Sequence, residues 1–536
     1  MKSTLYFNAN ILTQHEGQPS ASAMLVEGNT ILAVGSLREV SERKNENTLL
    51  VDVEGKTILP GFNDAHIHVW KVGQLESFII DLRDVESIAE LQRKVKTLAD
   101  KLPAGAWITG RGFNEQVLRD KRKPVKEDID AISTSHPIYL IRTCAHIAVT
   151  NSLAMKLANV SDTTIAPAGG VIGKDSSGKL NGLFYETALG LITKIIPTPT
   201  KSDYQKMILT GTAMMLRHGI TSATDPAVHP ELLEAYLELD AKKGLPIRLN
   251  LMPILLPDGG SAPYPIPQKY SSEFISVHTV KFFSDGGLSG KTAALKRPYK
   301  NSNEKGIVRL EREEYINLSR EAQQKGFRIA THAIGDVAID LVVDVYKTLH
   351  AEFGDTRNRI EHFGLPSEEN IQDVKKFGFV PVPQPIFLYE LGENFRSSLT
   401  DDYLNECYPV KSLLRNKIQV AFSTDAPVVK NISPWSCIKA AVNRKTNEGN
   451  PIAVQESITV SEAIYAYTVG SAYAEGQEKR KGSLEPGKLA DFIIVDKNPL
   501  VIPVDELDSI QIESVYIGGE LSLPSFRSAA EKSPPG

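Results

Sequence analysis

The stretch Leu59-Pro60-Gly61-Phe62-Asn63-Asp64-Ala65-His66-Ile67-His68 decides the fold, because it joins a β-type run to two histidines spaced two residues apart. In an extended strand, residues at i and i+2 point to the same side, so both imidazoles can reach one ion. Imidazole is a common ligand for zinc and similar metals. A single pair of this kind is also a common surface feature, so its meaning depends on the strands that follow.

Eight short runs with the composition of buried strands follow one another along the chain. They are Thr57–Leu59, which leads into His66, then Ile220–Asp225, Ile247–Pro253, Val277–Phe283, Phe327–His332, Arg359–Phe363, Phe379–Pro383 and Gln419–Asp425. Amphipathic helices precede several of them, such as Glu313–Lys325 and Glu369–Phe377. The alternation predicts a parallel α/β fold, and eight strands predict a (β/α)8 TIM barrel.

The two ends of the chain are rich in β-type runs and turns, for example Ala490–Val495 and Ile512–Ile517. We therefore expect a composite β-sandwich from both termini (1–60 plus 480–525), a barrel over 61–479, and a flexible tail at 526–536. About 150 residues separate the first two strand-like runs, which predicts an inserted subdomain at 70–205 after barrel strand 1. An insertion there emerges at the catalytic face of a barrel, so we expect it to roof the active site.

The composition is that of a globular protein with a sizeable core, with 41% hydrophobic and 23% charged residues among 536. The net charge of -5 gives no electrostatic reason to expect a nucleic-acid partner. Cys144, Cys407 and Cys437 are widely spaced and form no CxxC pair, which favours a reducing compartment. Without a signal-peptide pattern or a bilayer-length apolar run, the expected location is cytoplasmic, with no membrane partner.

Three more residues of metal-ligating type stand at the ends of predicted strands. His332 ends the fifth run, His362 falls near the end of the sixth, and Asp425 ends the eighth. Residues at the carboxyl ends of barrel strands converge on the catalytic mouth. Each one alone fits a capping or core polar group equally well, but ligand types at four strand ends favour a metal site.

Lys281 lies inside the apolar fourth run. Burying a charged amine is costly, so its pKa should fall and the amine should become nucleophilic. Such an amine can react with carbon dioxide to form a carbamate, an anionic oxygen ligand able to bridge two cations. The alternative is a lysine that reaches solvent or pairs with an acid.

The order of these residues along the chain resembles the amidohydrolase superfamily. In detail it resembles the amidohydrolase 3 family, which includes N-substituted formamide deformylase-like metal-dependent hydrolases. Further matching motifs are Pro60–Phe62, Val280–Gly286, Thr331–Asp336, Arg359–His362 and Gly482–Asp491. The resemblance implies a binuclear metal centre in which Lys281 is carboxylated and Asp425 acts as general base and acid. The implied metal ligands are His66, His68, Lys281, His332, His362 and Asp425.

The activity that the resemblance implies is hydrolysis of a non-peptide C–N bond in an amide, N-substituted formamide or cyclic imide. The attacking group would be a metal-bound hydroxide. The implied cofactors are one or two divalent metal ions, with zinc expected, and carbon dioxide for Lys281. The implied partner is a small amide-type substrate. Whether the chain also forms a homodimer is left as an open alternative.

Two other readings stay open. One is a mononuclear amidohydrolase-fold deaminase without a carboxylated lysine, and the other is a metal-free amidohydrolase-like scaffold protein. The complete set of ligand types favours an enzyme over a scaffold.

Four residues are candidate substrate contacts. His146 matches a family position in the inserted region that resembles a substrate-contacting histidine, although a structural histidine fits nearly as well. Asp336 lies one helical turn beyond His332, where it could orient a ligand or cap the following helix. Arg111 and Gln384 are weaker candidates, and Arg359 is a further weak candidate outside these four; for each of the three a structural role is the alternative.

Overall fold

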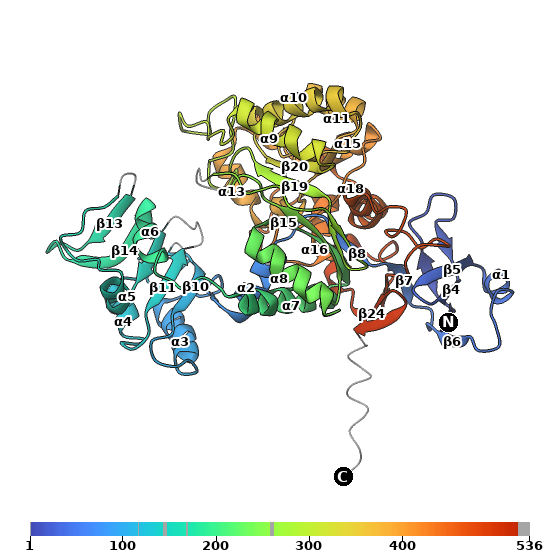
Figure 1. Cartoon of the computed structure of the whole chain (residues 1–536), viewed down its shortest axis with the longest axis horizontal. Helices are drawn as coiled ribbons and strands as arrows, with labels where there is room; N and C mark the ends of the chain where they lie inside the picture. Colours follow the sequence, from blue (N-terminus) through green and yellow to red (C-terminus); the bar gives the residue numbers. More distant parts are fainter. Residues whose placement is uncertain (1, 116, 143–146, 168–169, 258–261, 524–536) are drawn as a thin grey trace, which may run out of the picture. The chain divides into compact units, whose positions relative to one another are not determined.

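The computed structural model describes residues 2–115, 117–142, 147–167, 170–257 and 262–523, drawn in Figure 1. The chain divides into two compact units, one formed by Met1–Val69 with Thr212–Gly536 and the other by Trp70–Gly211. The predicted insertion, 70–205, falls within the second unit. Among the described residues, every helix is too short or too polar to cross a bilayer.

Two sheets of the first unit are built from the ends of the chain, one from N-terminal strands alone and the other from strands of both ends. One has the order β5-β4-β1-β6, with β1 at Ser3–Phe7, β4 at Ala23–Glu27, β5 at Thr30–Gly35 and β6 at Leu49–Asp52. The other has the order β25-β24-β23-β7-β2-β3, with β2 at Asn10–Leu12, β3 at Ser20–Ala21, β7 at Thr57–Pro60, β23 at Phe492–Val495, β24 at Ile512–Ile517 and β25 at Glu520–Leu523. Tyr6, Met24, Ile58 and Phe492 belong to one buried cluster, so the two sheets enclose a common core.

The centre of the first unit contains two sheets that are mainly parallel. The first has the order β17-β18-β16-β15-β8, with β8 at Phe62–Asp64, β15 at Ile220–Val228, β16 at Arg248–Pro253, β17 at Tyr270–Ser271 and β18 at Ile275–Val277. The second has the order β19-β20-β21-β22, with β19 at Thr279–Phe283, β20 at Arg328–Ala333, β21 at Arg359–His362 and β22 at Val380–Val382. An isolated parallel bridge between Ile254 and Lys281 links them.

Helices alternate with these strands, which gives the unit its α/β character (Figure 1). The larger ones are α7 (Lys201–Arg217, which begins in the second unit), α8 (Pro230–Ala241), α9 (Arg312–Gln324), α10 (Asp336–Phe353), α11 (Glu368–Phe377) and α16 (Pro434–Asn443). The shorter ones are α1 (Leu37–Ser41), α12 (Ile386–Glu390), α13 (Gly392–Ser398), α14 (Asp401–Glu406), α15 (Val410–Arg415), α17 (Val460–Tyr465) and α18 (Ser471–Glu475).

Helix α11 illustrates how local sequence sets these elements. Ser367 and Asn370 form a reciprocal capping box at its start, and Ile371 and Val374 provide a buried face at helical spacing. The helix ends at Gly378, whose φ of 70° is the left-handed conformation that glycine adopts without strain. The chain then enters β22, which leads directly to Gln384.

Two predicted strands differ from the structure. Thr57–Leu59 forms β7 of the terminal sheet, and the strand that leads to His66 is β8, which begins after Gly61. Gly61 has no room for a side chain, because a Cβ atom there would lie 2.2 Å from Thr221. The pair His66-Ile67-His68 follows β8 instead of lying within an extended strand.

Gln419–Asp425 forms no regular strand. Individual backbone bonds hold it in place: the amide of Ala421 donates to Pro381, that of Ala65 donates to Phe422, and that of Asp425 donates to His66. The φ of 56° at Asp425 is incompatible with a continuing β-ladder. The structure thus confirms an α/β fold, and closure of the two parallel sheets into a barrel stays a prediction.

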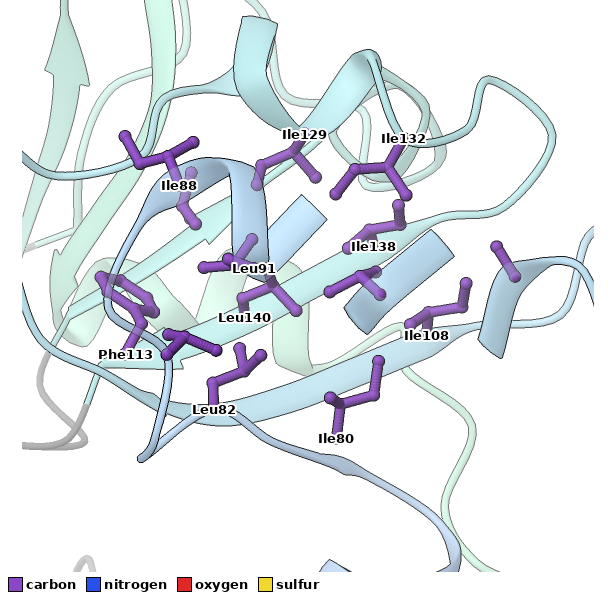
Figure 2. Packing of buried hydrophobic residues seen from close by; sticks show 14 of the residues in the cluster. Ile80, Leu82, Ile88, Leu91, Ile108, Phe113, Ile129, Ile132, Ile138 and Leu140 are labelled. Atoms are coloured by element: carbon purple, nitrogen blue, oxygen red, sulfur yellow. The ribbon is translucent and has the colours of Figure 1, made fainter. Parts of the chain in front are cut away.

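The second unit has its own six-stranded sheet, with the order β13-β14-β12-β11-β10-β9. Its strands are β9 (Ile80–Asp81), β10 (Ile108–Phe113), β11 (Ile138–Arg142), β12 (Ile147–Thr150), β13 (Gly170–Lys174) and β14 (Leu180–Glu186), and its helices are α2 (Val69–Ser77), α3 (Ile88–Ala99), α4 (Lys126–Asp130), α5 (Ser152–Leu157) and α6 (Gly190–Thr193). Leu91 of α3 packs with Ile108, Ile138 and Leu140 on one face of the sheet (Figure 2). The predicted helix at Ser87–Leu102 is α3, with Ser87 as its N-cap.

Candidate metal centre

Three buried side chains of ligand type converge in the first unit. Potential ligand atoms of His66, His362 and Asp425 all lie within 4.8 Å of one another. Nε2 of His66 lies 3.5 Å from Oδ1 of Asp425, and Nε2 of His68 lies 3.4 Å from the same oxygen. One carboxylate oxygen therefore faces both members of the predicted histidine pair.

The backbone is strained at two of these residues. His362 has a φ of 71° and Asp425 a φ of 56°, both in the left-handed region that residues with a side chain rarely adopt. Strain of this kind persists only where surrounding contacts impose it, and it concentrates at functional sites. Here it turns the last residues of two strand-like segments toward a common point.

A buried ion pair orients His66. Its Nδ1 donates to Oε2 of Glu361 at 2.5 Å, and Arg359 donates to both oxygens of that carboxylate, at 2.8 and 3.1 Å. Arg359 also donates to the carbonyl oxygen of Ala65 at 2.6 Å, which ties the pair to the histidine segment. Burial opposes ionisation of Glu361, but the charge of Arg359 and the hydrogen bond from His66 hold its pKa below its ordinary value.

Gln384 orients His362 in a similar way. The amide oxygen of Gln384 accepts a hydrogen bond from Nδ1 of His362 at 2.6 Å. The amide nitrogen of Gln384 donates to the carbonyl of Val382 at 2.7 Å and to the hydroxyl of Ser423 at 2.8 Å, which settles the orientation of the amide. Because Nδ1 is protonated in a neutral ring, Nε2 of His362 carries the lone pair.

These hydrogen bonds leave acceptor atoms facing one another. Burial lowers the pKa of His66 and takes that of His362 well below its ordinary value, so both rings are neutral at neutral pH. Burial opposes ionisation of Asp425, but the hydrogen bond from His68 and the nearby histidines keep its pKa below the usual range. A ring lone pair of His66 and an anionic oxygen of Asp425 thus face each other, an arrangement that a cation stabilises.

Lys281 projects from β19 with no measurable exposure of its side chain. Among the described residues, its Nζ has no hydrogen-bond partner, and it lies 4.7 Å from the ring centre of Phe283. Burial lowers the pKa of the amine to about 8, against the opposing influence of Glu361 and Asp425. The amine is therefore a far better nucleophile at neutral pH than an ordinary lysine, as the sequence predicted.

His332 lies beside this group, with its ring centre 4.3 Å from that of His362. Its Nε2 donates to the carbonyl of Gly286 at 3.1 Å and lies 3.4 Å from Asp285. Because that bond uses Nε2 as the donor, Nδ1 is the nitrogen left to act as a ligand. Asp285 accepts from the amides of Ala294, Ile334 and Gly335, which anchor the loops after β19 and β20.

Asp64 forms a second buried carboxylate network behind the centre. It accepts hydrogen bonds from the backbone of His66 and from the hydroxyls of Thr424 and Tyr467. Burial raises its pKa to about 7, although these hydrogen bonds act against the increase. The network joins the segment before His66 to the segment before Asp425.

Of the four predicted substrate contacts, Asp336 and Gln384 belong to the same unit as this centre. His146 lies outside the described residues, and Arg111 belongs to β10 of the second unit. Asp336 begins α10, where its carboxylate accepts from the backbone of Lys296 at 2.9 Å and from the hydroxyl of Tyr403 at 2.7 Å. Gln384 contacts a histidine of the centre, as described above.

Glu361 and Asp285 have no role predicted from the sequence, and Arg359 is only a weak candidate there. The available signal was a pair of opposite charges, Arg359 and Glu361, spaced two residues apart inside a strand that is buried throughout. Charged side chains at such positions require partners, and the i, i+2 spacing places them on one face of the strand.

The chain resembles known proteins over most of its length. Residues 49–522 match the profile described as "Amidohydrolase family". The chain is 30% identical to Protein LONG AFTER FAR-RED 3 of Arabidopsis thaliana, over 97% of this chain and 91% of that protein. It is 27% identical to N-substituted formamide deformylase of Arthrobacter pascens, over 97% and 98% of the two chains. The crystal structure of an uncharacterized metal-dependent hydrolase from Pyrococcus horikoshii OT3 superposes with a TM-score of 0.79 and 26% identity, over 94% of this chain and 99% of that one.

Proposed function

The chain belongs to the amidohydrolase family, and we propose that it is a metal-dependent hydrolase of non-peptide carbon–nitrogen bonds. The observation that carries the proposal is the buried group of His66, His362 and Asp425, in which ring lone pairs and an anionic oxygen converge. The solved relative titled a metal-dependent hydrolase supports the metal, and the relative named for formamide deformylation supports the bond class.

The residues at the centre fit two cations. His66, His68 and Asp425 would hold one, and His332 and His362 would hold the other. Lys281 would bridge them after its neutral amine adds to carbon dioxide, which forms an N–C bond and releases one proton. Histidine and carboxylate donors suit zinc, although they also suit neighbouring divalent metals. When bound, the metal supplies Lewis acidity, which activates water and polarises the carbonyl of the substrate.

Asp425 would move the protons. Its carboxylate is ionised at neutral pH, so it can accept a proton from the attacking water and later give it to the leaving nitrogen. An amide and one water would thus yield a carboxylic acid and an amine. Glu361 and Gln384 would act on His66 and His362 alone, by holding each ring with one nitrogen toward the centre.

The fold proposed for this centre is a closed (β/α)8 barrel. Two connections support it: the bridge between Ile254 and Lys281 at one junction, and the bonds of residues 421–425 to Pro381 and His66 at the other. Closure would bring the carboxyl ends of β8, β19, β20 and β21 to one rim, where the ligand residues stand.

A substrate screen tests the proposed activity. Metal-loaded protein is assayed against N-substituted formamides, N-acyl amino acids and cyclic imides, with release of amine or acid as the signal. We expect hydrolysis of at least one class, and a loss of about 100-fold or more in kcat for Asp425→Asn. Protein that holds its metal but hydrolyses none of the three classes would contradict the proposal. Full activity of Lys281→Ala with one metal would favour the mononuclear reading.

A further inference from the structure

The second unit contains a cavity of about 590 Å³ that lies entirely within it. Its walls come from residues between Gln74 and Met207, so none of the candidate metal ligands contributes to it. Cavities of this volume are typical of sites for small molecules. None of the residues given a role in the hydrolysis proposed above lines this cavity.

The alternation of side chains along β10 and β11 explains where the cavity lies. Ile108, Ile138 and Leu140 pack against α3 on one face of the sheet (Figure 2). Thr109 and Tyr139, which alternate with them, point to the opposite face and line the cavity, as does Ile141 further along β11.

A second buried cluster, which includes Phe184 and Ile192, covers part of this opposite face of the sheet. Over β10, the same face borders the cavity instead.

The remaining walls are mostly apolar. Phe78 and Ile79 follow α2, Met207 belongs to α7, and Ile196 and the adjoining stretch Pro197-Thr198-Pro199 close another side. Trp107, Phe78 and Ile79 are only half-buried, so they keep apolar surface that an apolar ligand would remove from water. Prolines restrict the backbone of the wall they form, so little conformational entropy would be lost on binding.

The charged side chains that line the cavity do not favour a charged ligand. Arg111 and Asp203 are the charged side chains among its described lining residues, and they have opposite signs. The carboxylate of Asp203 already accepts from the backbone and hydroxyl of Thr200, at 3.0 and 2.7 Å, in front of α7. Gln74 and Thr109 add neutral hydrogen-bonding groups to the wall.

We propose that the second unit binds an uncharged aromatic molecule that carries one hydrogen-bonding group. The aromatic ring would contact the apolar walls around Trp107 and Phe78, and the polar group would bond to Thr109 or Gln74. The lining of this proposed site includes none of His66, His362 and Asp425, and binding there needs no metal.

Ligand-observed fluorine NMR on the full chain tests this site with 4-fluoroacetophenone as the probe. We expect saturable binding that is unchanged after metal is removed with a chelator. The anion 4-fluorobenzoate and the cation 4-fluorobenzylammonium should bind at least tenfold more weakly. Quenching of Trp107 fluorescence should follow the same titration, and should disappear in Trp107→Phe while the fluorine signal still reports binding.

Two phenylalanine substitutions locate the probe. Thr109→Phe fills the cavity and should weaken binding at least tenfold. Val171→Phe adds the same ring to β13 of the same sheet, at a residue outside the cavity with 58% of its surface exposed, and should leave binding unchanged. If Thr109→Phe does not fold, Ile141→Trp serves as the second cavity-filling variant.

Several results would overturn the proposal. They are the absence of saturable binding to wild-type protein, loss of binding when metal is removed, tighter binding of either charged probe, and binding that folded cavity-filling variants leave unchanged.

Discussion

The substitution Glu361→Gln tests whether the buried ion pair of Arg359 and Glu361 orients His66 for metal binding. Glutamine has the same shape as glutamate but no charge, and its single amide oxygen cannot serve both His66 and Arg359 as the carboxylate does. The guanidinium of Arg359, which has no measurable exposure, would lose its counter-charge. The His66 ring would lose the acceptor that assigns the proton to Nδ1.

Two magnitudes follow from this geometry. Removing one partner of a buried ion pair destabilises a protein by about 3–5 kcal/mol, because the remaining charge stays buried without compensation. Loss of a partner that orients a ligating histidine weakens metal affinity by about 10–100-fold, or roughly 1.4–2.7 kcal/mol. We expect both effects in Glu361→Gln.

Asp491→Asn is the matched control. Asp491 also pairs with a buried arginine, Arg248, at 2.6 and 3.0 Å, but the pair lies at the start of β16 and contacts no candidate ligand. This variant should also lose stability, because it removes a buried partner of Arg248, and should keep its metal affinity. Affinity is measured by competition with a chelating dye at a temperature where both variants are folded, and stability by urea unfolding of metal-free protein.

The reasoning would be refuted if Glu361→Gln bound metal as tightly as wild-type protein. It would also be refuted if Asp491→Asn lost metal affinity to the same extent, because the effect would then come from general destabilisation. Only a loss confined to Glu361→Gln supports a role for the pair in orienting His66.

Three further predictions concern the same centre. Lys281→Ala should reduce bound metal from two equivalents to one and lower activity at least about 100-fold, measured by elemental analysis and steady-state kinetics, whereas two retained equivalents would rule out a bridging role. Because the amine of Lys281 has a pKa of about 8, its neutral fraction should rise from roughly a tenth at pH 7 to roughly nine tenths at pH 9. Reactivation of metal-stripped protein by bicarbonate and metal, normalised to dissolved carbon dioxide, should therefore speed up by roughly tenfold over this range, and a rate independent of pH would contradict the lowered pKa. Gln384→Leu, which removes the acceptor for Nδ1 of His362, should weaken metal binding by about tenfold, and an unchanged affinity in the dye assay would count against this contact.

The sequence predicted those parts of the fold that follow from local periodicity. The run Phe327–His332 corresponds to β20 and Glu313–Lys325 to α9, because a buried parallel strand is a short apolar run and a surface helix carries an apolar stripe. Periodicity reports burial but not the sheet that a strand joins. For that reason Thr57–Leu59 was assigned to the wrong sheet, although its burial was predicted correctly.

The candidate site was predictable to a similar degree. The residue types at strand ends indicated a centre, and the structure brings His66, His68, His362 and Asp425 together. The hydrogen bonds that set each ring were not predictable, because they join residues far apart in the chain, as Glu361 and His66 are. The turn of the backbone at Asp425 was also not evident, since aspartate at that position gives no local signal for a positive φ.

Anomalous X-ray diffraction from crystals of metal-loaded protein, recorded at the absorption edge of the bound metal, tests the central claim most directly. We predict an anomalous peak bounded by Nε2 of His66, Nε2 of His68 and the carboxylate of Asp425, at the roughly 2.0–2.2 Å ligand distances typical of zinc. A second peak should lie on the other side of the Lys281 side chain, with density for a carbamate of Lys281 between the two metal peaks. Metal bound only elsewhere, or no anomalous peak among these residues in crystals of active protein, would contradict the account.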